Sequence, residues 1–167
     1  MKAERKYLAH YLDSAFDKTY AATAYTQLGK DLEEFSVDLS PDVETSKNIL
    51  GENSVTFNGY EASGTVEPFY YEAEDALAEK IMEMAMLRNS PIGYPTSYVE
   101  VLLKPGADGT GPEVIRAVRE DVYVIPTSYG GDTSGVQVPF EIRFAGNRTP
   151  GTFDLKTKKF TETGTGL

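Results

Sequence analysis

The sequence contains no cysteine, no tryptophan and one histidine, His10. Without cysteine there is no disulfide, no thiolate nucleophile and no cysteine metal ligand. A single histidine excludes sites that need paired histidines, and in a predicted strand we expect His10 to be structural. A Gly-x-Ser-x-Gly nucleophile elbow is also missing. We therefore expect no enzyme activity and no catalytic, cofactor or metal site.

Long apolar runs are missing as well. No window approaches the roughly 20 apolar residues that a membrane-spanning helix needs, and the first residues lack the apolar run of a signal peptide. We expect a soluble protein made in the cytoplasm, without a membrane partner. With 167 residues, 40% of them hydrophobic, the chain suffices for a single domain over residues 1–167. Its flexible ends are expected at about 1–5 and 162–167.

Basic residues are scarce where acidic ones are dense. The net charge is −10, and residues 31–83 alone hold two Lys/Arg against fourteen Asp/Glu. Residues 1–30 carry a net +2, and residues 84–167 are neutral. Phosphate contacts need clustered Lys and Arg, so this distribution argues against a nucleic-acid binder. The acidic block either keeps the protein soluble or forms a surface that must not hold DNA.

The clearest strand pattern lies between Arg119 and Phe144. Apolar and polar residues alternate from Val136 to Phe144, the period of a half-buried strand. Residues 122–125 are apolar on both faces, which predicts a strand covered on both sides. Charges at 119–121 interrupt the phase and predict a bulge that bends a long strand. Between the two strands, residues 126–135 form a polar loop that we expect to dock onto something.

Other segments complete a mainly β pattern. Strands are predicted at 6–12, where a short helix is nearly as plausible, and at 33–39, 54–60, 64–71, 97–103 and 114–118, with a closing hairpin at 151–160. Val55 and Phe57 are expected to face inward, and Pro68 to confine its strand to an edge or bulge. Residues 41–53 predict a turn and an irregular crossing. Residues 13–26 predict a long connection.

The helix predicted from Ala73 to Asn89 places Leu77, Ile81 and Met84 on one face, which we expect to pack on a sheet. Met82 and Met86 fall among acidic residues on the other face. They are either a partner contact or ordinary exposed apolar residues. The expected fold class is α+β, mainly β: two antiparallel sheets as a sandwich or flattened barrel with this one flanking helix.

Several strings carry a resemblance to a known family. They are RKYLAHYLD at the start, LGKDLEE at Leu28 to Glu34, PDVET and KNILGE between Pro41 and Glu52, and SYGGDTSGVQVPFEIRFAGNR with GTFD between Ser128 and Asp154. In these strings, nearly the whole chain resembles the major tail protein, or tail tube protein, of long-tailed phages and prophages of Gram-positive bacteria.

The resemblance implies a tail-tube-like subunit of the virion tail, assembled in the bacterial cytoplasm. Its copies are expected to form hexameric rings that stack into a tube, contact other tail proteins and let DNA pass through an acidic lumen without specific binding. Expected subunit contacts are Tyr129, Asp132, Asp42, Glu44, Met82 and Met86. Expected lumen residues, chosen from local charge density, are Glu33, Glu34 and Asp38.

Three other interpretations stay open at this stage. A secretion-system tube subunit shares the architecture without the phage context. A small-ligand-binding β-barrel predicts a deep interior with a few buried polar groups. An enzyme that uses surface carboxylates and a divalent metal predicts His/Asp geometry that the sequence does not display.

Overall fold

A computed structural model describes residues 2–17, 25–90 and 93–163. Within these ranges the chain is mainly β with one α-helix, as expected. The elements are η1 (Arg5–Tyr7), β1 (Leu8–Asp13), β2 (Tyr25–Leu28), β3 (Val37–Asp38), β4 (Pro41–Lys47), β5 (Asn53–Tyr60), β6 (Ser63–Val66), α1 (Ala76–Leu87), β7 (Tyr94–Lys104), β8 (Glu113–Pro126), β9 (Gly130–Asp132), β10 (Gly135–Gln137), β11 (Phe140–Phe144), β12 (Thr149–Asp154) and β13 (Lys159–Glu162).

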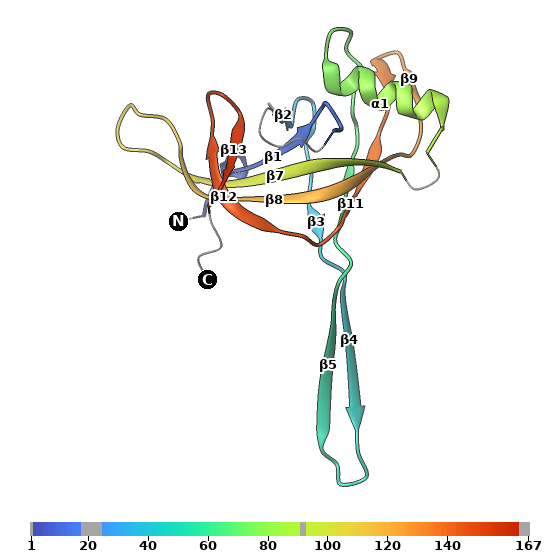
Figure 1. Cartoon of the computed structure of the whole chain (residues 1–167), viewed down its shortest axis with the longest axis vertical. Helices are drawn as coiled ribbons and strands as arrows, with labels where there is room; N and C mark the ends of the chain where they lie inside the picture. The colour runs from blue at the N-terminus through green and yellow to red at the C-terminus, as the bar shows by residue number, and fades with distance from the viewer. Residues whose placement is uncertain (1, 18–24, 91–92, 164–167) are drawn as a thin grey trace.

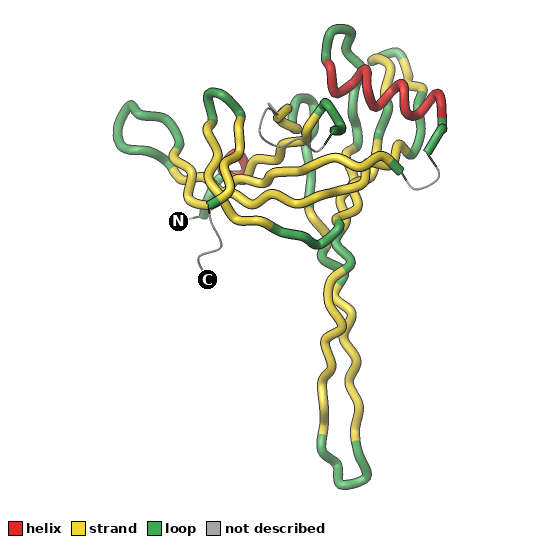
Figure 2. Tube along the Cα trace, viewed as in Figure 1, coloured by secondary structure: helices red, strands yellow, loops and turns green. Residues whose placement is uncertain are grey.

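Nine of the described strands form one antiparallel sheet that curls into a half-barrel (Figures 1 and 2). Its order is β2-β1-β7-β8-β11-β6-β3, and β12 and β13 branch from β8. The sheet curls because β8 pairs with β7 along its length on one side, while its partner on the other side changes from β12 to β11. It pairs with β12 at 117–119 and with β11 from Val122 onward. The body is therefore closer to the expected flattened barrel than to two separate sheets.

The core has two parts, on opposite faces of β1 and β7. Leu12 and Tyr98 belong to the larger cluster, which α1 covers together with β6, β8 and β11. Tyr11 and Val99, their chain neighbours, belong to a second cluster closed by Phe153 and Phe160 of the β12–β13 hairpin. Adjacent strand residues point to opposite faces, so β1 and β7 are covered on both sides. The sequence placed such double cover at 122–125 instead, where Ile125 is 36% exposed.

The predicted bulge lies elsewhere in β8. Pairing with β7 runs without a break through residues 119–121, and the register shifts between Leu102 and Leu103, opposite Arg116 and Val114. The charges do not interrupt the strand because Glu120 is buried, 3% exposed, and bonded to Arg148. The loop predicted at 126–135 also contains structure of its own, the small β9–β10 hairpin.

Helix α1 begins at Asp75, whose side chain accepts hydrogen bonds from the backbone N–H groups of Leu77 and Ala78. Leu77, Ile81 and Met84 are buried, as predicted. The placement of Met82 away from the core is wrong: it is half-buried and packs on the larger cluster. Ala78 and Ala85 are buried too, which widens the covered arc toward it.

The largest departure from the sequence prediction lies between 33 and 60. The strand predicted at 33–39 is reduced to β3, although Phe35 is buried. The irregular crossing predicted at 41–53 is wrong, because 41–47 form β4 and pair with β5. We call residues 41–60 the arm. The arm projects straight away from the body (Figures 1 and 2).

In the described part of the chain, α1 is too short to span a bilayer, and no other helix has the length and apolarity to do so. The predicted flexible tail falls largely on residues 164–167, which lie outside the described residues.

Candidate assembly surfaces

The arm is an amphipathic ribbon whose apolar face is uncovered. Val43 lies opposite Phe57, and Thr45 lies opposite Val55. Paired residues in a hairpin share a face, so these side chains form one apolar stripe. Exposure is 51% for Val43, 67% for Val55 and 52% for Phe57. The prediction that Val55 and Phe57 point into a core is therefore wrong.

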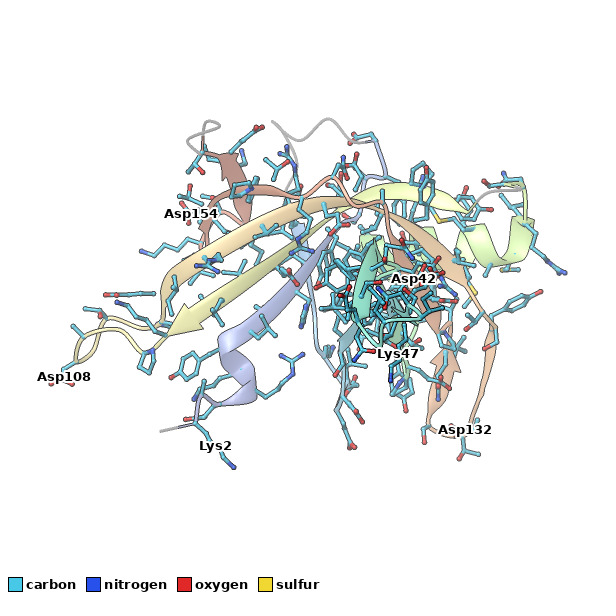
Figure 3. All side chains as sticks on the ribbon, turned by 90° about the horizontal axis from the view of Figure 1, so that it is seen from below. Lys2, Asp42, Lys47, Asp108, Asp132 and Asp154 are labelled. Carbon is cyan, nitrogen blue, oxygen red and sulfur yellow. The ribbon has the colours of Figure 1, made fainter. Side chains whose placement is uncertain are left out.

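The opposite face of the arm is polar. Glu44 lies opposite Thr56, and Ser46 lies opposite Ser54, with their hydroxyl oxygens 2.7 Å apart. Among the described strands, β4 and β5 pair only with each other. Figure 3 views the molecule from below, along the arm, which stands in front of the curled sheet with Asp42 and Lys47 labelled on it. The arm thus has no core of its own.

A bulge at the base of the arm extends the apolar stripe. Pro41 pairs with Tyr60 and Val43 pairs with Phe57, so β5 carries one more residue than β4 between these pairs. Gly59 has a φ of 106°, a conformation that glycine adopts without strain. The extra residue brings Tyr60, 60% exposed, onto the face of Phe57, and their rings meet edge to face at 4.9 Å.

The tip of the arm presents two aliphatic side chains on an ordered turn. The Asn48 side-chain oxygen accepts hydrogen bonds from the backbone N–H of Leu50 at 2.9 Å and of Glu52 at 3.0 Å. Its amide nitrogen donates to the Glu52 carboxylate at 3.0 Å. Ile49 is fully exposed and Leu50 is 77% exposed. A hydrogen-bonded turn therefore holds two apolar side chains in water, where they gain nothing from burial.

A groove of about 570 Å³ opens between the C-terminal end of α1, the start of β7 and the end of β8. Met84, Tyr94 and Ile125 give it an apolar wall, and Arg88 and Tyr129 stand together, with the Arg88 guanidinium donating to the Tyr129 hydroxyl at 3.1 Å. None of the described residues that line this groove is acidic. In a chain of net charge −10, that makes the groove unusual.

A second hollow, of about 710 Å³, has the opposite character. Glu33 and Glu34, predicted as lumen residues, line it with Asp31 and Glu67. The sequence did not associate Glu67 with them, since only the curl of the chain brings 67 close to 31–34. Asp38, the third predicted lumen residue, is exposed on β3 outside this hollow, and its carboxylate accepts from the Ser40 N–H at 3.0 Å.

The other predicted contact residues are spread over the surface. Asp42 and Glu44 are exposed on the arm. Tyr129 is 46% exposed at the groove, and Asp132 is exposed at the end of β9, where its carboxylate accepts from the Ser134 N–H at 2.8 Å. Met86 is 60% exposed on α1. The structure therefore brings Tyr129 into the groove and leaves the others apart from it.

Sequence reasoning missed the residues that stand out most in the structure, the apolar ones on the arm. The signal was present as strict alternation at Val43, Thr45, Val55 and Phe57. It did not distinguish a stripe that faces a core from one that faces solvent, because both have the same period. Only tertiary structure separates the two.

Beneath the surface, a polar network links the N-terminal segment to β7 and β8. The Arg5 guanidinium lies 2.9 Å from His10 Nε2, and His10 Nδ1 bonds to the Tyr98 hydroxyl. Because Arg5 donates to Nε2, we assign the neutral tautomer with its proton on Nδ1. Burial, together with the charge of Arg5, lowers the pKa of His10 to about 4.

Arg148 forms the other end of this network. Its guanidinium contacts the carboxylates of Glu100 and Glu120, the latter at 2.6 Å. The second Glu120 oxygen accepts from the Gly146 N–H at 2.6 Å. Glu120 is thus a buried carboxylate with a cationic partner, the condition under which buried charge is tolerated. These contacts connect β7, β8 and residues 146–148, and we interpret them as structural.

Among the described residues, no group of three or more histidine, cysteine, aspartate or glutamate side chains is arranged to hold a metal ion. Comparison with protein-family models found no match, and a search of curated proteins found none either.

Proposed function

We propose that the protein is the structural subunit of a phage or prophage tail tube. In this proposal six copies close into a ring, rings stack into a hollow tube of the virion tail, and DNA passes through it. The tube also meets other tail proteins at its ends. The likeness to a tail tube protein rests on the resemblance of the sequence strings. The exposed apolar and acidic surfaces of the chain are physical support for the proposal.

The observation that carries the proposal is the arm. Contiguous exposed apolar surface on a soluble protein marks an interaction site. The stripe formed by Val43, Val55, Phe57 and Tyr60, with Ile49 and Leu50 at the tip, has no cover within the described chain. The hairpin's own chain leaves these apolar side chains exposed, and contact with a second copy would bury them.

Two further features support assembly. Among the described strands, the curled sheet ends in β2 and β3, and sheet edges of this kind suit pairing between copies. Glu33, Glu34, Asp31 and Glu67 gather in one acidic hollow. A surface of that charge repels phosphates, which suits a conduit that must not retain DNA.

The test compares two variants with the same charge change on opposite faces of the arm. The double variant Val55→Asp/Phe57→Asp alters the apolar stripe, and Ser54→Asp/Thr56→Asp alters the polar face of the same strand. Sedimentation velocity at rising protein concentration measures assembly for each and for the unaltered protein. We expect stacked oligomers from the unaltered protein and the polar-face variant, and no species larger than a single ring from the apolar-face variant.

Equal loss of assembly in both variants would show that added charge, not the apolar stripe, is responsible. An unaltered protein that stays monomeric at every concentration would contradict the tube-subunit function itself.

A further inference from the structure

The two hollows described above differ in how well they suit the apolar tip of the arm. Of the two hollows described above, the acidic one presents Asp31, Glu33, Glu34 and Glu67. The tip carries Glu52 beside its aliphatic pair, so like charges oppose its entry there. The α1–β7–β8 groove presents apolar walls and the single cation Arg88. Charge and polarity therefore favour the groove.

The dimensions of the two partners agree. The groove, of about 570 Å³, has room for two aliphatic side chains and is open to the surface. Ile49 and Leu50 stand side by side at the tip, 102% and 77% exposed, with Glu52 held next to them through Asn48.

The arm and the groove lie at opposite ends of the molecule. Figure 1 shows the arm pointing away from the body at one end and α1 with β9 at the other. A contact between opposite ends of two copies is heterologous, and repetition of such a contact builds an open stack. Strand β4 has seven residues and β5 has eight, a reach of roughly 25 Å at the usual strand rise.

Building on the tail-tube function proposed above, we propose that the Ile49–Leu50 tip of one copy inserts into the α1–β7–β8 groove of the next copy along the stack. Arg88 at the groove rim then pairs with Glu52 of the incoming tip. The groove is thus a receptor for a second copy of this chain.

Cross-linking of introduced cysteines tests this contact, because the natural chain has no cysteine to interfere. One double variant carries Leu50→Cys at the tip and Ser128→Cys at the groove. A control carries Leu50→Cys and Ala107→Cys, which lines a different surface hollow beside the 105–112 loop. Assembled protein is treated with a short bismaleimide and resolved on a denaturing gel, and electron microscopy of the same sample records whether tubes are present.

A tip-to-groove contact predicts a ladder of dimers, trimers and higher species from the first double variant, and little beyond background from the control. Each single-cysteine variant should give no more than background dimers, because its chain carries one thiol and the opposite side of the tip-to-groove contact carries none. Tubes without the ladder, or an equal ladder from the control, overturn the groove assignment and leave the tube function standing. Absence of tubes and of any cross-link contradicts both.

A second experiment tests the proposed pairing of Arg88 at the groove rim with Glu52 of the tip. Arg88→Glu, which opposes Glu52, is expected to raise the concentration needed for assembly by roughly tenfold, and the exchanged pair Arg88→Glu/Glu52→Arg is expected to recover most of it. No recovery by the exchanged pair overturns the pairing of these two side chains.

Discussion

At the scale of single residues, His10 and Glu120 are buried ionisable groups that each lie beside an arginine. His10 is on β1 and Glu120 is on β8, both strands of the curled sheet, so their contributions concern folding of the body. His10 is 4% exposed and Glu120 is 3% exposed. Burial and the neighbouring Arg5 both oppose a positive charge on His10, whereas Arg148 lies beside the Glu120 carboxylate as its cationic partner.

His10 makes stability depend on pH. Its pKa is about 4 in the folded protein and about 6.5 when unfolded. The unfolded chain therefore binds the proton first, and stability that is complete above pH 6.5 is lost as the pH falls toward about 4. The loss attributable to His10 is about 3 kcal/mol. Urea unfolding at several pH values should show a steeper decline for the natural protein than for His10→Gln, and parallel curves would contradict this role.

Glu120 depends on Arg148 for charge compensation. Arg148→Met leaves a buried carboxylate with the Gly146 N–H as its remaining contact from this network. We expect a loss of about 3 to 5 kcal/mol in the free energy of unfolding. The double variant Arg148→Met/Glu120→Gln should lose less than the single change, because the uncompensated charge is gone. Losses that simply add in urea titrations would mean that the pair is not coupled.

At the scale of elements, we expect the arm to contribute little to the free energy of unfolding of the body. Val55 and Phe57 are more than half exposed, whereas Phe140 in β11 is fully buried. Val55→Asp/Phe57→Asp should therefore change the free energy of unfolding by only about 1 kcal/mol or less. Phe140→Ala should cost about 3 to 5 kcal/mol. Thermal unfolding of monomers measures both, and a large loss from the arm variant would show that the stripe packs on the body.

The elements also show what local pattern determines. Helix α1 was predictable because Leu77, Ile81 and Met84 repeat at helical spacing, although the predicted bounds, Ala73 to Asn89, are wider than the observed Ala76–Leu87. The alternation in β11 was read correctly at Phe140 and Ile142, both buried. The arm was not predicted, since residues 41–53 were interpreted as a turn and an irregular crossing, and Val55 and Phe57 as residues that face a core. Whether the apolar face of a strand is buried depends on the whole fold, and the alternation of its residues does not reveal it.

At the scale of the whole molecule, charge counts located the acidic region but not its geometry. Glu33, Glu34 and Asp38 were chosen as lumen residues from local charge density, and the structure places the first two in one hollow with Asp31 and Glu67 and leaves Asp38 outside it. The groove next to α1 joins segments about forty residues apart, 84–94 and 125–129. Contacts between such distant segments depend on the register of β7 with β8, which no local pattern specifies.

The shape of the molecule favours head-to-tail assembly. The molecule has an arm at one end and an apolar groove at the other, so its two ends differ. Copies that bind head to tail through two different ends extend without limit unless the contacts close into a ring. In the tube that we propose, ring closure and stacking use different surfaces, the sheet edges for the first and the arm for the second.

Negative-stain electron microscopy of the concentrated, purified protein tests that claim most directly. The account predicts rings and stacked tubes with a stain-filled central channel, and rings without stacks when the Val55→Asp/Phe57→Asp variant is imaged. Uniform small particles of the unaltered protein at every concentration would contradict it.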